Sequence, residues 1–310
     1  MRAALADSLA HVYAVAAGHV NLADVDIPGG LSEIRAHRIG PGVFGRYYDL
    51  VFAVHAQRYD DAGTLFREIV GLASQQPIFA VLPYGIEALG ADHERYARLL
   101  SFETGSQVLL GAPEADELLE FEGFVVAALE LIEQADAALA AELRAVVIQV
   151  VGAIPAMQSG RRGFGGASSF MLWGAVLLNV RYYNNRLDMV AALIHEAAHQ
   201  VLFGHSLDEP LVENPLEERY GSPLRIDSRP MDGIFHATFV CARMHYAYVR
   251  LMDGAGNSLS KGDRELVAER LRDYREKFFN GLETVQRFGR MTSNGDRIIN
   301  AAADYMRSGS

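Results

Sequence analysis

The sequence is 310 residues long and its formal charge is −11, because 39 Asp and Glu outnumber 28 Lys and Arg. Half of the residues are hydrophobic and 22% are charged, a composition that excludes a disordered or fibrous protein. The acidic balance argues against nucleic acid and anionic lipid as partners, since both bind a basic face. The single cysteine, Cys241, excludes an intramolecular disulfide and a cysteine-cluster metal site, and it favours a cytoplasmic location.

The N-terminus does not have the pattern of a targeting segment. Asp7 and His11 interrupt its apolar stretch, so an amphipathic helix is expected over residues 1–18. No run approaches the roughly 18 uninterrupted apolar residues of a membrane-spanning helix, and none is expected.

The first half of the chain is mostly helical in pattern. Residues 20–46 carry the turn signals Pro28-Gly29-Gly30 and Gly40-Pro41-Gly42. Short apolar runs at 78–82 and 146–154 predict strands. The acidic residues at the start of the helical pattern over 114–145 indicate a solvated helix face rather than a metal site. The helical patterns cover about 45–57, 61–74, 91–104 and 114–145.

The second half begins with a glycine-rich connector at 159–167, which lacks the spacing of a phosphate-binding loop. Residues 168–183 predict one or two strands, with Gly174 at a kink or turn. A helix is predicted over 185–203, with Asn184 or Asn185 as its cap and Gly204 at its end. An irregular stretch at 205–232 precedes further helices, which are predicted over 233–252, 259–287 and 295–306.

The helix predicted over 185–203 contains an H-E-x-x-H motif, His195-Glu196-Ala-Ala-His199. Residues four apart share one face of a helix, so the two imidazoles can bind one metal ion. Glu196 lies about 100° round the axis, where it can contact a metal-bound water or orient a ligand. The flanking residues are apolar on nearly all sides, which favours a buried helix over one with exposed histidines. Buried histidines need polar partners, and a metal ion supplies one.

Two histidines leave a metal site incomplete, and four downstream residues are candidates for the third ligand. His205 has the spacing of metzincin peptidases, although Leu202 stands where that pattern has glycine. Glu217 and Glu218 lie near the spacing of gluzincin peptidases. His236 lies on the next predicted helix, on an apolar face, where a hydrogen-bonded core histidine is the ordinary interpretation. The residue pattern alone leaves the choice open.

The expected fold class is mainly α (α+β), a helical bundle with a small β-sheet that precedes a metal-binding H-E-x-x-H helix. Residues 1–160 would form a mostly helical region that recognises a peptide or supports the site. Residues 161–310 would bind the metal and cosubstrate. The two regions are also compatible with one continuous domain.

Several motifs in this order resemble the H-E-x-x-H family of peptide-modification proteins. Members of that family are regarded as Fe(II)- and 2-oxoglutarate-dependent peptide β-hydroxylases, which act in pathways for ribosomally made, modified peptides. The similarity is sharp over about residues 165–245. Its elements are Ser168-Ser169, Gly174, Leu178-Asn179, the H-E-x-x-H motif, Glu218 to Pro223, Arg225, Asp227, Arg229, Pro230, Gly233, His236, Phe239 and Val240.

The resemblance implies an oxygenase that uses Fe(II), 2-oxoglutarate and O₂ on a peptide substrate, with or without a leader segment. Its iron ligands would be His195, His199 and His236, although a carboxylate as third ligand stays open. Arg225 and Arg229 would bind the far carboxylate of 2-oxoglutarate, which suits the planar guanidinium. Glu196 would hold a ligand or a water beside the iron. The resemblance implies neither nucleic acid nor membrane as a partner, and it indicates no oligomeric state.

Two other functions fit the same residues. In a zinc-dependent metallopeptidase, Glu196 would be the general base, and Glu218 or His205 would be the third zinc ligand. Alternatively, the chain would bind peptides without catalysis, with a structural metal or none, and its negative charge would attract a basic peptide.

Overall fold

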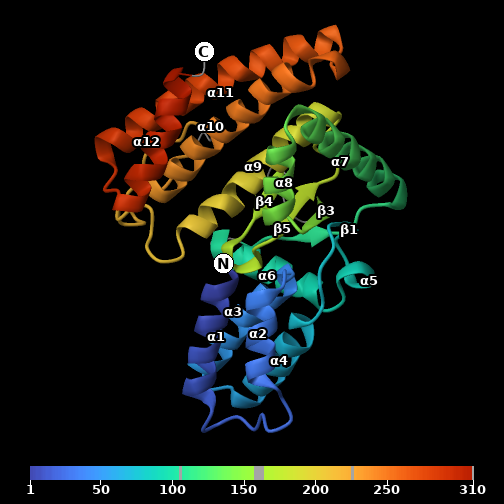
Figure 1. Cartoon of the computed structure of the whole chain (residues 1–310), viewed down its shortest axis with the longest axis vertical. Coiled ribbons are helices and arrows are strands. Elements are labelled where there is room, and N and C mark those ends of the chain that lie inside the picture. The colour runs from blue at the N-terminus through green and yellow to red at the C-terminus, as the bar shows by residue number, and fades with distance from the viewer. Residues whose placement is uncertain (105–106, 157–163, 225–226, 309–310) are drawn as a thin grey trace. The chain divides into compact units, whose positions relative to one another are not determined.

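The computed structural model describes residues 1–104, 107–156, 164–224 and 227–308, and it is mainly helical with a small mixed β-sheet (Figure 1). The predicted mainly α class with a small β-sheet is confirmed, whereas metal binding by the H-E-x-x-H helix stays a prediction. The chain forms two compact units, one of residues 1–118 and 147–180, the other of residues 119–146 and 181–310. Within the described ranges, no helix has the length and apolar character needed to cross a membrane.

Four helices begin the first unit and share one apolar core, around Leu9, Leu50 and Phe66. They lie side by side at the blue end of the chain in Figure 1. Each of the four helices contributes an apolar face to this core. Burial of these faces stabilises the packing of the helices. The helices are α1 (Arg2–Ala16), α2 (Ile27–Ala36), α3 (Pro41–His55) and α4 (Tyr59–Ala73).

The turn predicted at Pro28-Gly29-Gly30 is wrong, because this segment is the first turn of α2. The Asp26 carboxylate accepts a hydrogen bond from the Gly29 N–H at 2.9 Å and so caps the helix. Proline is tolerated there because the first-turn N–H groups have no partner within the helix. Gly30 lies so close to Val70 of α4 that a Cβ would come within 2.8 Å of its side chain.

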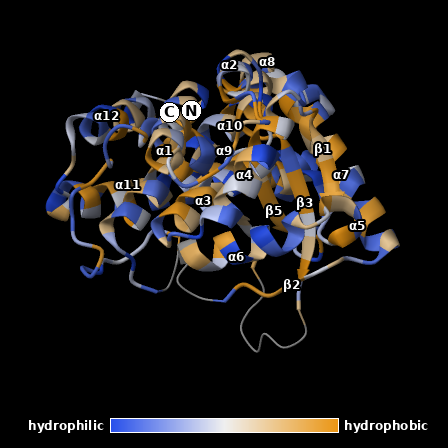
Figure 2. Ribbon diagram, turned by 90° about the horizontal axis from the view of Figure 1, so that it is seen from below, coloured by the Kyte–Doolittle hydropathy of each residue, from blue (hydrophilic) through white to orange (hydrophobic). Residues whose placement is uncertain are grey.

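The sheet of the first unit has the strand order β1-β3-β5-β4, with β2 paired to the end of β3. β1 and β5 run parallel to β3, and β4 runs antiparallel to β5. Both strands predicted from apolar runs are present, as β1 and β3. The central strands β3 and β5 are among the most apolar segments in Figure 2, as expected for buried strands. The bounds are β1 (Ala80–Pro83), β2 (Leu110–Gly111), β3 (Gln149–Pro155), β4 (Gly166–Ser168) and β5 (Ala175–Asn179).

Gly174 forms the predicted kink, between the short 3₁₀ helix η1 (Phe170–Leu172) and β5. Its φ of +98° is in a region that residues with a Cβ rarely adopt. The connector predicted at 159–167 lies largely outside the described residues, and its last two positions begin β4.

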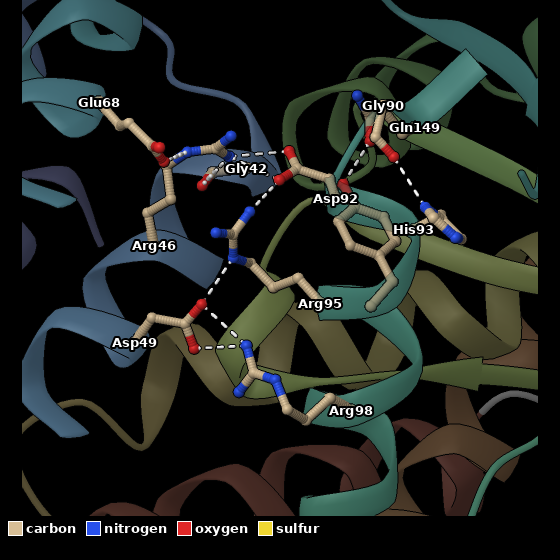
Figure 3. A network of polar contacts seen from close by, with 11 residues as sticks. Gly42, Arg46, Asp49, Glu68, Gly90, Asp92, His93, Arg95, Arg98 and Gln149 are labelled. Atoms are coloured by element: carbon tan, nitrogen blue, oxygen red, sulfur yellow. Dashed lines mark hydrogen bonds and ion pairs between the residues drawn. The ribbon is translucent and has the colours of Figure 1, made fainter. Parts of the chain in front are cut away.

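A network of charged side chains connects α3 to α6 (Asp92–Thr104), which follows the short helix α5 (Ile86–Leu89) (Figure 3). Asp92 lies between Arg46 and Arg95, and Asp49 lies between Arg95 and Arg98. The four inner side chains are only 13–19% exposed. Because each buried carboxylate has two guanidinium partners, the cost of removing these charges from water is offset by pairing. The network therefore fixes α6 against α3.

Among the described residues of the second unit, the regular elements are all helices. Its central element is α10 (Met231–Gly254), which packs against α9 (Arg186–His205), α11 (Lys261–Phe288) and α12 (Ser293–Ser308). Figure 1 shows α10 and α11 running alongside one another in orange. Phe235 and Cys241 of α10 and Phe278 of α11 belong to one buried apolar cluster. α7 (Ala115–Ala135) and α8 (Ala137–Val146) complete this unit, except that the first turn of α7 belongs to the first unit.

α9 begins as the sequence predicts. The side chain of Asn185 accepts a hydrogen bond from the Asp188 N–H at 2.9 Å, which caps the helix. The helix continues one residue beyond Gly204, to His205. This placement sets both His195 and His199 inside one helix, one turn apart.

Candidate metal centre

The H-E-x-x-H motif lies on α9, most of whose side chains are buried, as predicted. His195 and His199 keep a partly exposed edge. Their Nε2 atoms lie 3.3 Å apart, and the ring centroids are 5.0 Å apart. The helical spacing therefore brings the same nitrogen of each ring to one point on the surface of the helix.

His236, on α10, joins this pair. Its Nδ1 atom lies 3.1 Å from the Nδ1 atom of His199, and the two rings are stacked with centroids 5.4 Å apart. The ring of Phe203 lies beside both of these imidazoles, at 6.4 Å and 5.8 Å between centroids. The packing of α10 on α9 thus brings the three histidines together beside the ring of Phe203.

All three imidazoles are neutral near pH 7. Burial lowers the pKa of His195 to about 4. Burial also lowers the pKa of His199, and the two neighbouring imidazoles lower it further. Burial lowers the pKa of His236, while the nearby Asp232 carboxylate opposes this shift. A neutral imidazole has the lone pair that binds a metal ion, so the cluster is in its ligating form.

These shifts predict a pH dependence of stability in the metal-free protein. The imidazole pKa values are depressed below 6.5 in the folded state, so the unfolded chain binds more protons as the pH falls below 6.5. The free energy of unfolding should therefore be highest above pH 6.5 and decrease towards pH 4, by about 1–3 kcal/mol for His195. Urea unfolding in EDTA between pH 4.5 and 7.5 measures this. His195→Gln should reduce the slope, and an unchanged slope would contradict the assignment.

The donor types and spacings fit a metal ion, whereas the ring orientations fit only in part. Two imidazole nitrogens, each about 2.1 Å from one ion, lie about 3.0–3.4 Å apart, and the separations here are 3.1 and 3.3 Å. However, His199 faces His195 with Nε2 and His236 with Nδ1. Within the described parts of the chain, no three His, Cys, Asp or Glu side chains are therefore arranged to hold an ion. A turn of the His199 or His236 ring would be needed to bring three donors together.

Glu196 lies on the buried side of α9 and is 4% exposed. Tyr183, which precedes α9, is also buried, and burial followed by the charge of Glu196 raises the pKa of its hydroxyl. The Glu196 carboxylate is thus within electrostatic range of Tyr183. This position beside the histidines, inside the protein, agrees with the predicted 100° offset from the histidine face.

Of the candidate third ligands of a peptidase, Glu218 has other side-chain partners, and His205 and Glu217 are exposed. His205 ends α9 on the exposed surface, and its carbonyl accepts a hydrogen bond from Asn294 at 2.6 Å. The Glu218 carboxylate pairs with Arg290 at 3.3 Å and accepts hydrogen bonds from Asn214 and Tyr220, which lower its pKa. Glu217 is exposed.

The two arginines expected to bind 2-oxoglutarate are not brought to the histidines by any contact that is described. Arg225 lies outside the described residues. Arg229 is 42% exposed, and its guanidinium lies 3.4 Å from the Asp227 carboxylate. The Arg229 backbone pairs with Tyr220 through two hydrogen bonds of 2.8 and 2.9 Å. The role of both arginines stays a prediction.

The sequence interpretation overlooked Asp232 and Phe203. Asp232 lies one helical turn before His236, and its Oδ1 atom is 3.7 Å from the His236 Nε2 atom. Phe203 lies one turn after His199. Each of these residues is four positions from a proposed ligand. This i, i+4 spacing is the sequence signal that would identify them as neighbours of the histidines.

In comparisons with known proteins, no family model matches this chain, and no curated protein matches it significantly. The geometry of the candidate site places three neutral imidazoles side by side, with Glu196 on the buried side of the same helix.

Proposed function

We propose that the protein is an Fe(II)- and 2-oxoglutarate-dependent oxygenase that hydroxylates a side-chain β-carbon of a ribosomally made peptide. The observation that supports this most is the position of His236 next to His199. It favours a three-imidazole ligand set over the peptidase sets that use His205 or Glu218. Three protein ligands leave the positions that a keto-acid cosubstrate and O₂ require.

Each residue of the candidate site would have a separate role. His195, His199 and His236 would hold the iron, which together with 2-oxoglutarate and O₂ supplies the oxidising chemistry when bound. Phe203 would exclude water from one side of the cluster. Glu196 would orient a ligand or water from the buried side. Arg225 or Arg229 would bind the far carboxylate of the cosubstrate through its planar guanidinium.

The direct test is single-turnover chemistry. The protein is loaded with Fe(II) without oxygen, mixed with 2-oxoglutarate and a candidate peptide, and then exposed to air. Succinate and a peptide heavier by one oxygen atom are the expected products, both measured by mass spectrometry. Elemental analysis of the purified protein tests the non-catalytic alternative first. No succinate with any plausible peptide, together with zinc-supported peptide hydrolysis, would overturn the proposal.

A zinc metallopeptidase is the second candidate, because Glu196 is buried beside the histidines as a general base would be. The substitution Glu196→Gln separates the two. In an oxygenase it should leave metal binding intact and lower turnover by less than about 100-fold, because Glu196 would only orient a ligand or a water. In a peptidase, loss of the general base should lower turnover by about 10²–10⁴-fold. Succinate release and peptide hydrolysis are measured on the same preparations.

A further inference from the structure

A groove with a volume of about 500 Å³ lies among α3, α4 and α6, all of which belong to the first unit. This volume is within the roughly 300–1,000 Å³ that is usual for small-molecule sites. None of the residues that line the groove belongs to the histidine cluster. Both charged and apolar side chains line it, including Asp49, Phe52, Arg58, Asp61, Leu65 and Arg98.

The position of the groove follows from the pairing of α3 with α4. Arg46 of α3 and Glu68 of α4 form an ion pair of 2.7 Å, which fixes the two helices side by side. Asp49 and Phe52 follow Arg46 on one face of α3, because residues three apart share a helix face. Leu65 precedes Glu68 by the same spacing on α4. The buried charge network shares Asp49 with the groove and so forms one end of it (Figure 3).

The apolar part of the groove is aromatic and extends to the surface. Phe52 and Leu65 are partly buried and line the groove. The ring of Phe102, on α6, lies 5.4 Å from the ring of Phe52 between centroids. Phe102 is 63% exposed, so its ring continues the apolar surface of the groove towards solvent. A bound apolar group would remove this surface from water, which is favourable.

The polar part of the groove has more donors than acceptors at Asp49. This carboxylate accepts hydrogen bonds from Arg95 at 2.7 Å and from the Nη2 atom of Arg98 at 2.6 and 2.8 Å. Within the described residues, no acceptor contacts the Nε or Nη1 atom of Arg98, whose side chain is 53% exposed. Arg58, which lines the groove from the start of α4, pairs with Asp61. The two carboxylates of the groove would repel a doubly charged anion more than a singly charged one.

We propose that this groove binds a small carboxylate that carries an aromatic or aliphatic group. The carboxylate accepts hydrogen bonds from the Nε and Nη1 atoms of Arg98, whose planar guanidinium suits two parallel contacts. The apolar group covers Phe52, Leu65 and Phe102. A free carboxylic acid and the carboxyl-terminal residue of a peptide share this chemistry. The proposal does not rest on the metal centre, so either can fail without the other.

The test uses N-acetylphenylalanine as the probe, with full-length protein dialysed free of metal, in ligand-observed NMR titrations. Saturable binding with a Kd of about 1 mM or tighter is expected. N-acetylphenylalanine amide lacks the charge and acetate lacks the ring, so each should bind at least about 10-fold more weakly. Tighter binding of N-acetyl-Gly-Gly-Phe would identify a peptide terminus as the ligand, and equal binding a free acid. Equal affinities of N-acetylphenylalanine and its amide would overturn the proposal.

Two variants locate the probe in the groove. Arg98→Gln should weaken binding by about 10-fold, as expected for the loss of a charge-assisted contact. Phe102→Ala should weaken it by about 2- to 10-fold and leave the fold intact, because this ring is mostly exposed. Arg67→Gln is the matched control, since Arg67 is an exposed arginine of α4 that pairs with Asp24 outside the groove. If Arg98→Gln and Phe102→Ala both bound the probe as Arg67→Gln does, the groove would not be its site.

Discussion

The substitution His236→Ala should remove metal binding, with a loss of affinity greater than the 10- to 100-fold typical of outer-shell residues. The physical reason is that His236 is the third imidazole of the cluster, 3.1 Å from His199. Two imidazoles from one helix do not complete a site. Fe(II) and Zn(II) affinities are measured by equilibrium competition. His205→Ala and Glu218→Ala should bind as wild type does, because the His205 side chain is exposed and the Glu218 carboxylate pairs with Arg290.

A matched control for this experiment exists on the same helix. His245 is also a buried histidine of α10, and its Nδ1 atom lies 3.0 Å from the Tyr305 hydroxyl rather than at the cluster. His245→Ala should lower stability and leave the metal affinity unchanged. Circular dichroism is used to check that each variant is folded. If Glu218→Ala lost the metal and His236→Ala kept it, the peptidase ligand set would be correct.

The second large effect is expected at Gly254, the last residue of α10. A Cβ at this position would lie 2.2 Å from the carbonyl oxygen of Ala135, which ends α7. The obstacle is backbone, so it cannot turn aside as a flexible side chain would. Gly254→Ala should lower the free energy of unfolding by about 1–3 kcal/mol or more, as overpacking does. Urea unfolding followed by circular dichroism measures the change.

Gly123 provides the comparison for that experiment. It lies in the interior of α7, and a Cβ there would meet nothing within 4 Å. Gly123→Ala should therefore stabilise the protein by up to about 1 kcal/mol, from helix propensity alone. Equal stabilities of the two variants would show that the ends of α10 and α7 are not in close contact.

The helix that carries the candidate site could be predicted from the sequence because its features are local. The H-E-x-x-H spacing, the apolar flanks of α9 and the Asn185 cap are all properties of one helix, and each is confirmed. The position of His236 depends instead on how α10 packs against α9. The apolar helix face around His236 predicts that this residue is buried. Only the family resemblance favours His236 as a metal ligand.

Other features could not be predicted, for physical reasons that differ. The Pro-Gly-Gly pattern at the start of α2 predicts a turn because these residues usually break helices. A cap by Asp26 and close packing of Gly30 on Val70 favour the helix here. Which ring nitrogen faces which neighbour depends on side-chain rotation in a packed cluster. Sequence spacing has no information about that rotation.

The path of the chain between the two units has a consequence for modularity. The first unit is interrupted after residue 118 and resumes at 147, and the second unit is assembled from residues on both sides of β3 to β5. Among the described residues, β1 pairs with β3, which is synthesised after α7 and α8. A fragment that ended at residue 118 would lack the centre of its own sheet. Neither unit can therefore be transferred to another protein as one continuous gene segment. A recombination that exchanges one unit would have to keep the segments of the other unit that interrupt it.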